Sequence, residues 1–454
     1  MAGYAKYWDE QRETMAPKER EKVILERIKE QLNYVYHNLP FYRDLYDAHN
    51  FKPEMVKTLE DFTTKVPIIK KSMLVEDQKK FPPFGRYRGI ADEDDAIRVQ
   101  GSSGTSGAPT FYSVSKEDFE RGAESIAMCY WITGIRPNDL VQLSFPFGVF
   151  FGGWGALQGL ERLGATVFPV GATESKRQLE LMEHVKPTVL TSTISYMFHL
   201  MEKARELGFN LKENSIRKLI AGGEPGGSLP ANKKIIKETW GAPLHDVSTT
   251  SEMYPFLTNV ECEELAGPHT ITDEVYTEIV NKNDPNVPAP MGERGGIVYT
   301  HLWRKSQPMI RFFPGDESCM VDEPCACGRT YPRLPYGIIG RLDDMLVIRG
   351  VNIYPSAIED ILRQISGLGK EFIIVVDKKG AMDELSVEVE CSPGALQNLG
   401  EEEKENLKKR LTEQAFEDLK TKIGIRISVR VVEPGTLDET LFKARRVVDN
   451  RKNE

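Results

Sequence analysis

Residues 101–110, which read GSSGTSGAPT, are the part of this sequence whose residue types most directly suggest chemistry. Glycines allow the backbone to turn its N–H groups toward one point, and serine and threonine hydroxyls add further donors. Such a concave set of donors suits the oxygens of a phosphate group. A flexible Gly/Ser turn or linker is the alternative interpretation. The segment lacks the lysine of a Walker A loop, and its spacing does not fit a G-x-S-x-G nucleophile turn.

A second group of residues, in the later half of the chain, has types that could bind a metal ion. Cys262 is followed by His269, and Cys325 and Cys327 stand together further along. Three thiolates and one imidazole match a closed tetrahedral zinc site, which is structural because no coordination position stays open for a substrate. A disulfide between Cys325 and Cys327 would be strained. Unligated thiols are the alternative interpretation, and Cys319 is a possible substitute ligand.

Alternating helical and strand-like stretches between residues 115 and 245 must position the glycine-rich loop. The loop itself has strand-like flanks at 97–100 and 110–114, and an apolar period of helical spacing covers 17–38. Further helices are predicted at 115–134, 155–164, 175–185, 195–208 and 230–240, and strands at 140–145, 165–170, 188–193 and 216–223. This rhythm predicts a mostly parallel sheet covered by helices.

The character of the sequence changes after residue 250 and again near residue 340. Glycines, prolines and short strands such as 295–302 predict an antiparallel β portion that closes the larger domain. Four strands, at 344–350, 371–376, 385–390 and 425–432, and two helices, at 356–365 and 401–420, follow. They suffice for a compact domain. We therefore expect an α/β protein with a large N-terminal domain over residues 1–341 and a small C-terminal α/β domain over residues 342–454.

Composition excludes several classes of protein. The 454 residues are 40% hydrophobic, enough for sizeable cores, and their net charge of −9 disfavours a nucleic-acid binder. A nucleotide substrate stays compatible because a local pocket can oppose the global sign of charge. The sequence contains no apolar run of about 18 residues, and its N-terminus lacks an apolar signal core. Six cysteines do not form a secreted disulfide framework. We expect a cytoplasmic protein without a membrane or nucleic-acid partner.

Five further motifs follow the loop in a fixed order, and together they resemble a known family. They are IAGGEPGG (220–227), DVSTTSE (246–252), MIRFFPGD (309–316), GRLDDMLVIRGVNIYPSAIE (340–359) and FKARRVVDNR (442–451). Over nearly the whole chain this pattern resembles the adenylate-forming enzymes, and most closely the phenylacetate–CoA ligase family. The resemblance implies an adenylation domain and a mobile C-terminal domain joined by a hinge. It also implies two steps: a carboxylate attacks the α-phosphorus of ATP and expels pyrophosphate, and the thiol of CoA then attacks the acyl-adenylate.

The resemblance implies a role for each motif in holding the nucleotide. Glu252 matches the glutamate that ligates Mg²⁺, a cation that prefers carboxylate and phosphate oxygens. The loop residues implied to hold the β- and γ-phosphates are Ser102, Ser103, Gly104, Thr105, Ser106 and Gly107. The remaining ATP- or AMP-binding residues are Gly223, Glu224 and Pro225 at the adenine wall, Ser248 and Thr249 from the DVSTTSE motif, and Asp316 and Arg341 at the ribose. The chain departs from the family at Ala108, Ser248 and Phe313, where relatives usually carry lysine, tyrosine and arginine.

Four residues near and beyond residue 340 are implied to drive the reaction and the domain movement. Lys443 is the catalytic lysine that meets the carboxylate and the α-phosphate as charge develops, and a solvated lysine is the alternative. Asp343 is the hinge about which the small domain turns. Arg349 and Gly350 face the pantetheine arm of CoA, where a close passage excludes a Cβ atom.

The segment after residue 144 falls where the family lines its acid site. Phe147, Gly148, Phe151 and Met253 are the acyl-pocket residues, and aromatic side chains suit an aryl or arylacetic acid, phenylacetate-like. Core packing is the alternative role for each. A small hydroxy or branched acid is the alternative substrate, because Phe and Met side chains can also shrink a pocket.

The leading interpretation is an ATP-dependent, AMP-forming acid–CoA ligase. It uses ATP, CoA, Mg²⁺ and a small carboxylic acid, and carries a structural Zn²⁺; a homodimer is a further expectation. Two rival functions remain open at this point. One is a synthetase that adenylates another acceptor, such as a deazaflavin-type cofactor, without CoA. The other is a non-catalytic binding protein on the same scaffold.

Overall fold

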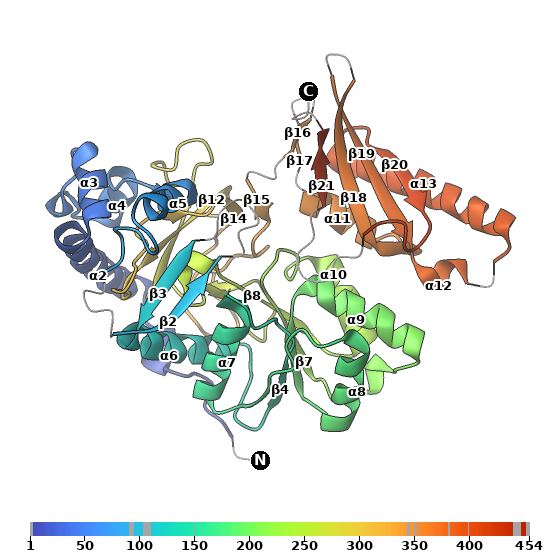
Figure 1. The fold of residues 1–454 in the computed structure, drawn as a ribbon, viewed down its shortest axis with the longest axis horizontal. Coiled ribbons are helices and arrows are strands. Elements are labelled where there is room, and N and C mark those ends of the chain that lie inside the picture. Colours follow the sequence, from blue (N-terminus) through green and yellow to red (C-terminus); the bar gives the residue numbers. More distant parts are fainter. Residues whose placement is uncertain are drawn as a thin grey trace.

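The structure is a computed structural model that describes residues 3–89, 95–102, 110–149, 151–342, 346–348, 351–353, 355–379, 382–397, 399–438 and 446–450. Its described residues form two lobes, which Figure 1 shows side by side with the C-terminal lobe at the upper right. The large lobe comprises the described residues up to 342, and the small lobe comprises those from 346 onward. This mixed α/β architecture with a separate C-terminal unit confirms the predicted fold class. The predicted boundary between residues 341 and 342 stays a prediction.

A seven-stranded sheet with the order β10-β9-β8-β7-β6-β4-β5 forms the centre of the large lobe. Its strands are β4 (Leu140–Leu143), β5 (Thr166–Phe168), β6 (Val189–Ser192), β7 (Lys218–Ala221), β8 (Leu244–Ser248), β9 (Asn259–Val260) and β10 (His269–Thr270). Neighbours from β5 to β8 run parallel, and β9 and β10 are antiparallel additions. Strands β6 and β7 are buried at every position, as expected for a sheet covered on both faces.

The helices beside this sheet follow the predicted rhythm. They are α6 (Lys116–Ile132), α7 (Phe151–Leu163), α8 (Ser175–Val185), α9 (Ile194–Leu207) and α10 (Pro230–Trp240). Helix α8 and helix α10 have the predicted bounds, whereas α7 already covers Phe151, ahead of the predicted start at residue 155. Because α7 includes this residue, part of the predicted acyl-pocket segment is helical.

A second, six-stranded sheet in the large lobe is mostly antiparallel. Its strands are β1 (Ile69–Lys70), β11 (Val275–Val280), β12 (Arg294–His301), β13 (Phe312–Phe313), β14 (Asp316–Cys319) and β15 (Gly340–Arg341). Only the pair β1–β13 is parallel among the pairings of this sheet in the described residues, and it ties the N-terminal segment to the sheet. The N-terminal helices α2 (Pro17–Asn38), α3 (Pro40–Ala48), α4 (Leu59–Lys65) and α5 (Lys71–Lys80) share a buried core with it, which includes Leu32, Tyr42 and Phe312.

Two short strands flank the glycine-rich loop as predicted. Strand β2 (Ala96–Gly101) pairs antiparallel with β3 (Phe111–Ser115), and the register places Gly101 opposite Phe111. In Figure 1 this pair lies in front of the second sheet, between α5 and α7. The strand pair therefore carries the two ends of the loop toward the large lobe's interior.

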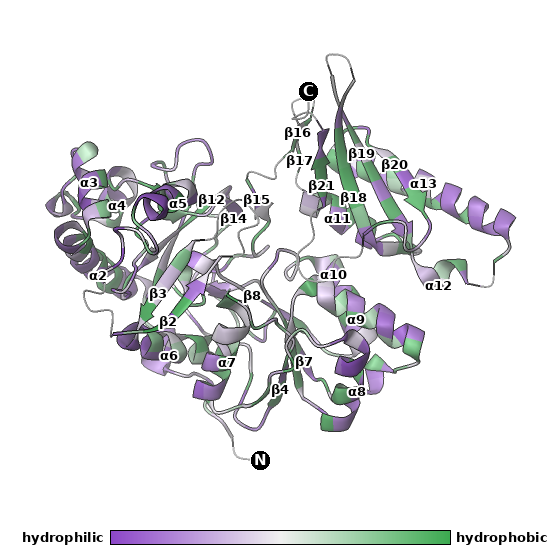
Figure 2. Cartoon of the chain, viewed as in Figure 1, coloured by the Kyte–Doolittle hydropathy of each residue, from purple (hydrophilic) through white to green (hydrophobic). Residues whose placement is uncertain are grey.

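The small lobe has its own sheet and its own core. Strands β18 (Leu368–Lys379), β19 (Met382–Cys391), β20 (Ser428–Val432) and β21 (Val447–Asp449) have the order β20-β19-β18-β21, and β16 (Leu346–Ile348) pairs with β17 (Val351–Ile353). Helices α11 (Pro355–Arg363), α12 (Pro393–Leu396) and α13 (Glu401–Ile423) accompany them. Figure 2 shows apolar colour along β18 and β19 and polar residues along the outer face of α13. Within the described ranges, we find no helix whose length and apolar character match a bilayer span.

Candidate functional site

The two ends of the glycine-rich loop are joined directly. The N–H of Ser102 donates to the carbonyl of Thr110 at 2.9 Å, and the N–H of Thr110 donates to Ser102 Oγ at 3.1 Å. Both side chains are buried. The loop residues between them, including Ser103, Gly104, Thr105, Ser106 and Gly107, lie outside the described residues. The chain therefore enters and leaves this loop at one point, which suits a phosphate cradle better than an extended linker.

A line of hydrogen bonds leads from Ser102 and Thr110, which form the neck of the loop, to Glu252. Thr110 Oγ1 and Tyr112 OH are 2.7 Å apart, and Tyr112 OH donates to Glu252 Oε1 at 3.3 Å. Glu252 belongs to a short 3-10 helix, Ser251–Met253, and is buried. Burial, with a further contribution from the Glu252 carboxylate, raises the pKa of Tyr112 well above its usual value, so the phenol stays a neutral donor. The fold thus brings the predicted magnesium ligand to the predicted phosphate loop.

Lys71 is a site residue that the sequence reasoning missed. Its Nζ lies 3.1 Å from Glu252 Oε1, and its side chain is 34% exposed. Lys71 begins α5 directly after β1, and the pairing of β1 with β13 fixes this helix start beside the site. The alanine at position 108, where relatives usually carry lysine, was the feature of the sequence that could have indicated this residue. A loop without its usual lysine needs a cation from elsewhere.

The backbone behind Glu252 is held by a buried arginine. Arg304 is fully buried; its Nη1 donates to the carbonyl of Glu252 and its Nη2 to the carbonyl of Ser113, each at 3.2 Å. Burial lowers the pKa of Arg304, and the nearby Asp118 carboxylate opposes that shift. One side chain therefore links the strand after the glycine-rich loop to the segment that presents Glu252.

Asp316 and Arg341, both predicted to contact the ribose, are neighbours in the structure. They are opposite one another in the register of β14 and β15, and Arg341 Nη1 lies 3.2 Å from Asp316 Oδ1. Their side chains are 36% (Arg341) and 14% (Asp316) exposed. The pair therefore presents both a carboxylate and a guanidinium at the edge of the second sheet that faces the small lobe (Figure 1).

Polar side chains surround Ser248, where the family usually carries tyrosine. Asn259 Nδ2 donates to Ser248 Oγ and to Tyr299 OH, each at 3.0 Å. Burial raises the pKa of Tyr299, and the Asp316 carboxylate adds to the shift. Thr249 Oγ1 donates to a main-chain carbonyl at 2.9 Å, so its hydroxyl proton is already used. The sequence did not predict this polar cluster, which joins the DVSTTSE motif to β12 through Asn259 and Tyr299.

The predicted adenine wall is anchored to the start of α9. Glu224 Oε1 accepts a hydrogen bond from the backbone N–H of Ser195 at 2.6 Å. Burial raises the pKa of Glu224 to about 7, while the hydrogen bonds from Ser195 oppose the shift. Gly223 has a φ of +88°, which favours glycine, and both Gly223 and Pro225 are exposed. The exposed backbone of this turn is free to line a flat ring.

The predicted acyl-pocket residues divide into exposed and buried members. Gly148 is exposed and Phe147 is half-buried, with its ring 5.0 Å from that of Trp154 in an edge-to-face contact. Phe151 is buried, with its ring 4.7 Å from that of Tyr254. Met253 is completely buried in the core of the N-terminal helices and second sheet. The packing role foreseen as an alternative is therefore visible for Met253 and Phe151.

Asp343, Arg349, Gly350 and Lys443 lie outside the described residues, as does most of the loop. Their described neighbours are two pairs of strands. Ile348 pairs with Val351 across β16 and β17, and the described C-terminal segment resumes at residue 446 beside β18.

The four predicted metal ligands form one compact cluster. The ligand atoms of Cys262, His269, Cys325 and Cys327 all lie within 4.8 Å of one another. Cys262 Sγ and Cys325 Sγ are 3.8 Å apart, and Cys327 Sγ is 3.4 Å from His269 Nε2. His269 Nδ1 lies 3.1 Å from the carbonyl oxygen of Tyr331, to which it donates, so the lone pair of Nε2 faces the thiols. This donor set fits a tetrahedral zinc ion.

The surroundings of the cluster tie it to the N-terminus. Arg329 Nε lies 2.5 Å from the buried carboxylate of Glu13, and Tyr7 OH donates to the carbonyl of Cys327 at 3.3 Å. A hydrogen bond from Cys262 lowers the pKa of Cys327, which favours its thiolate. Cys319, the proposed substitute, does not belong to this cluster in the described part of the chain.

Comparison with known proteins gives matches of three kinds: a family model, a curated relative and solved structures. Residues 350–451 match the family model of the AMP-binding enzyme C-terminal domain. The chain is 33% identical to phenylacetate-coenzyme A ligase from Thermus thermophilus over 446 residues, which cover 96% of this chain and 98% of the relative.

The solved structures include 2-hydroxyisobutyryl-CoA ligase in two states. In the postadenylation state, in complex with 2-HIB-AMP, it is 39% identical, covers 100% of this chain and 94% of its own, and superposes with a TM-score of 0.93. In the thioesterification state, in complex with 2-HIB-AMP and CoA, it is 40% identical, covers 99% and 94%, and superposes with a TM-score of 0.73. The structure therefore superposes more closely on the first complex than on the second.

Proposed function

Since the chain belongs to the phenylacetate–CoA ligase family of adenylate-forming enzymes, we propose a specific acid and specific residues for its reaction. It is an AMP-forming acid–CoA ligase. The acid that we propose is an aryl or arylacetic acid. The observation that carries the site assignment is the hydrogen-bonded line Ser102–Thr110–Tyr112–Glu252, which joins two motifs far apart in sequence. This line supports the proposal because it joins the two ends of the loop to a carboxylate, and transfer of an adenylyl group from ATP needs phosphate-binding donors and a metal ligand close together.

In this proposal, fixed donors and cations stabilise the charge that develops on the phosphates. The loop residues 102–107 hold the β- and γ-phosphates. Glu252 is the Mg²⁺ ligand; its buried carboxylate oxygen is the hard donor that this ion prefers, and bound Mg²⁺ neutralises phosphate charge. Lys71 supplies the cation that the loop lacks at Ala108, because its Nζ already lies beside Glu252. Asp316 and Arg341 hold the ribose hydroxyls.

The second half of the proposal concerns the small lobe. Lys443 completes the adenylation site, and residues 342–454 then turn about Asp343 so that Arg349 and Gly350 meet the pantetheine arm of CoA. The two complexes of 2-hydroxyisobutyryl-CoA ligase support such a turn. This chain superposes with a TM-score of 0.93 on one and of 0.73 on the other at nearly the same sequence identity, as a different placement of the small lobe would produce.

The structure and the comparisons support two acid substrates of different size. The half-buried Phe147 and its edge contact with Trp154 offer an aromatic surface, which supports an arylacetic acid. The second candidate is a small hydroxy acid. It is supported by the relative that acts on 2-hydroxyisobutyryl groups and by the packing of Phe151 against Tyr254, which reduces the room for a ring.

A panel of acids tests these proposals directly. AMP release and acyl-CoA formation are measured with phenylacetate, benzoate, 2-hydroxyisobutyrate and acetate, each with and without CoA. Preference for phenylacetate supports the main proposal, and preference for 2-hydroxyisobutyrate replaces it by the second candidate. AMP release without any thioester product would favour an acceptor other than CoA, such as a deazaflavin-type cofactor. Absence of AMP with every acid would contradict the ligase function.

A structural zinc ion in the cluster of Cys262, His269, Cys325 and Cys327 completes the proposal. The cluster is supported by its ligand types and by the orientation of the His269 ring. Four protein ligands leave no position for a substrate, so this ion would stabilise the fold and take no part in the reaction.

A further inference from the structure

The boundary between the two lobes contains a charged contact that the reaction, as described so far, does not use. Lys370 at the start of β18 extends to α9 of the large lobe, where its Nζ lies 3.0 Å from Glu202 Oε2 and 3.1 Å from His199 Nδ1. The Lys370 side chain is 9% exposed and that of Glu202 is 25% exposed. Ion pairs on the open surface contribute little to stability, but one that is mostly removed from water is screened much less.

The contact is directional because further residues hold the His199 ring and the backbone of Lys370. An ammonium group has only protons to donate, so His199 Nδ1 must accept and its Nε2 must carry the ring proton. That Nε2 lies 2.9 Å from Ser175 Oγ, which fixes the ring. On the other side, Arg363 Nη2 donates to the carbonyl of Lys370 at 2.8 Å. Arg363 also lies over the ring of Phe198, 4.9 Å from its centre, and so adds a second contact between the lobes.

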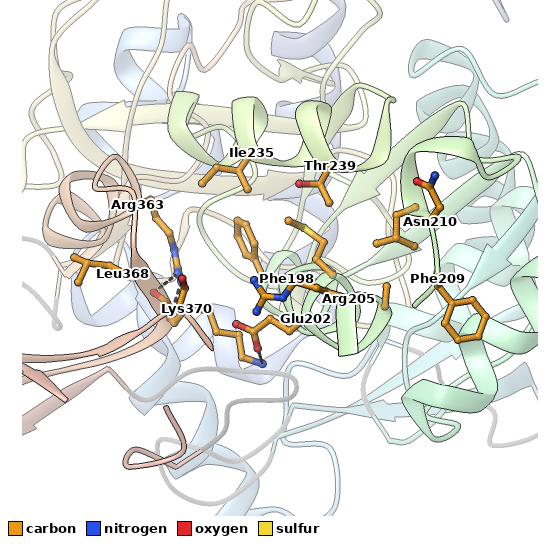
Figure 3. A pocket seen from close by; sticks show the side chains of 15 residues that line it. Phe198, Glu202, Arg205, Phe209, Asn210, Ile235, Thr239, Arg363, Leu368 and Lys370 are labelled. Carbon is orange, nitrogen blue, oxygen red and sulfur yellow. Dashed lines mark hydrogen bonds and ion pairs between the residues drawn. The ribbon is translucent and has the colours of Figure 1, made fainter. Parts of the chain in front are cut away.

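Four of the residues named above, Lys370, Glu202, Arg363 and Phe198, line a cavity of about 500 Å³ between the lobes. Figure 3 shows Lys370 and Arg363 on the small-lobe side of this cavity, with Phe198 and Glu202 of α9 facing them. At this cavity, the ion pair of Lys370 with Glu202 and the contact of Arg363 with Phe198 cross from one lobe to the other. An ion pair that forms in one lobe arrangement and breaks in another shifts the balance between the two.

The same contact is continuous with the C-terminal segment. Glu371, next to Lys370, forms an ion pair of 2.6 Å with Arg446, and the carbonyl of Arg446 accepts a hydrogen bond of 2.7 Å from Ile374 in β18. Arg446 follows shortly after Lys443 in the sequence. The strand that is held at the lobe boundary through Lys370 is therefore the strand against which the lysine-bearing segment is anchored.

We infer that Lys370, through its contact with Glu202 and His199, is a positioning residue for the adenylation half-reaction. The contact favours the lobe arrangement of this structure, which resembles the postadenylation complex of the relative, and must break when the small lobe turns for thioesterification. Lys370 touches neither nucleotide nor acid in this role. The inference rests on the proposed two-step reaction and adds to it the contact that selects between the two steps.

The test measures the two half-reactions separately in the full-length protein. Adenylation is followed as pyrophosphate exchange into ATP with the acid that the panel identifies, and thioesterification as CoA-dependent decay of preformed acyl-adenylate. For Lys370→Met we expect adenylation to fall about 10-fold, a typical size for coupling between two states, while thioesterification stays unchanged or becomes faster. Glu202→Gln should change the same ratio in the same direction, and the charge swap Lys370→Glu with Glu202→Lys should restore it in part.

A matched control shows whether the loss of any lysine ion pair has the same effect. Lys404→Met removes a lysine whose ion pair with Glu401 lies within the small lobe, and it should leave the ratio of the two rates unchanged. An equal loss of both rates in Lys370→Met would indicate a merely structural role and overturn the inference, as would an unchanged ratio. If wild-type protein releases no AMP at all, the proposed function fails first, and that result differs from either outcome.

Discussion

The cysteine–histidine cluster and the nucleotide site are built in opposite ways. All four ligands of the cluster lie within one lobe, and their donor atoms are within 4.8 Å of one another. The nucleotide site is distributed: its loop neck, Glu252 and Asp316 belong to the large lobe, while the proposed Lys443 belongs to the C-terminal region. The cluster needs residues of the large lobe alone, whereas the proposed catalytic site also needs a residue from the small lobe.

This difference follows from what each site has to do. A structural metal ion must bind once and stay, so ligands preset by a backbone hydrogen bond, such as that of His269, lower the cost of binding. A ligase that forms an adenylate and then a thioester needs two successive sets of groups around one intermediate. We therefore expect substitutions at the cluster to change stability first, and substitutions at the nucleotide site to change rates first.

The largest expected effect on the reaction is that of Lys443→Ala. Removal of one preorganised charge from a phosphoryl-transfer site costs about 10²–10³-fold in rate. We expect pyrophosphate exchange to fall by this factor, with thioesterification of supplied acyl-adenylate and Tm unchanged. Pyrophosphate exchange at the wild-type rate would remove Lys443 from the catalytic site.

Substitution at the cysteine–histidine cluster should lower the stability of the protein and leave the adenylation rate nearly unchanged. Cys327→Ser leaves three ligands, and we expect about one zinc ion to be lost per chain and the free energy of unfolding to fall by about 3 kcal/mol, the large end of single-residue effects. Adenylation measured well below Tm should change little, because the ion has no open position. Zinc content and thermal unfolding are the measurements.

Cys319→Ser is the matched control for this experiment, because Cys319 is a buried cysteine outside the cluster. It should leave the zinc content unchanged. Wild-type protein without stoichiometric zinc after gentle purification, or a Cys327→Ser protein with full zinc content, would contradict the metal site.

The sequence predicted the cluster and the helices of the large lobe well, because both depend on local or near-local patterns. The bounds of α8 and α10 follow from apolar spacing, and the four residues of the cluster follow from their types and their spacing. Strand β21 and the parallel pairing of β1 with β13 were not foreseen, because short strands are defined by partners far away in sequence. Tyr112, Asn259 and Tyr299 were missed for the same reason.

Lys71 was identified only because it lies close to Glu252 in the structure. Its substitution therefore tests whether such a residue belongs to the catalytic site. If its ammonium group replaces the absent loop lysine, Lys71→Met should lower adenylation about 10-fold, which corresponds to about 1.4 kcal/mol. The loss should appear partly in the KM for ATP, and thioesterification should be unaffected. Lys70→Met is the control, because Lys70 is exposed and precedes the helix. Equal behaviour of the two variants would assign Lys71 to the surface.

The smallest expected effect is that of Tyr112→Phe, which removes only the hydroxyl that joins Thr110 to Glu252. A hydrogen bond of this kind contributes about 1 kcal/mol, so adenylation should fall about 5-fold. The phenol donates to the Glu252 carboxylate, so its loss should also change the Mg²⁺ concentration needed for half-maximal rate. That concentration should rise if the hydrogen bond orients the carboxylate toward the metal. It should fall if the hydrogen bond competes with the metal for the carboxylate. An increase identifies Tyr112 as an orienting residue. An unchanged rate and an unchanged Mg²⁺ requirement would show that the line from the loop to Glu252 is packing alone, and the nucleotide site would then rest on Glu252 and Lys71 without it.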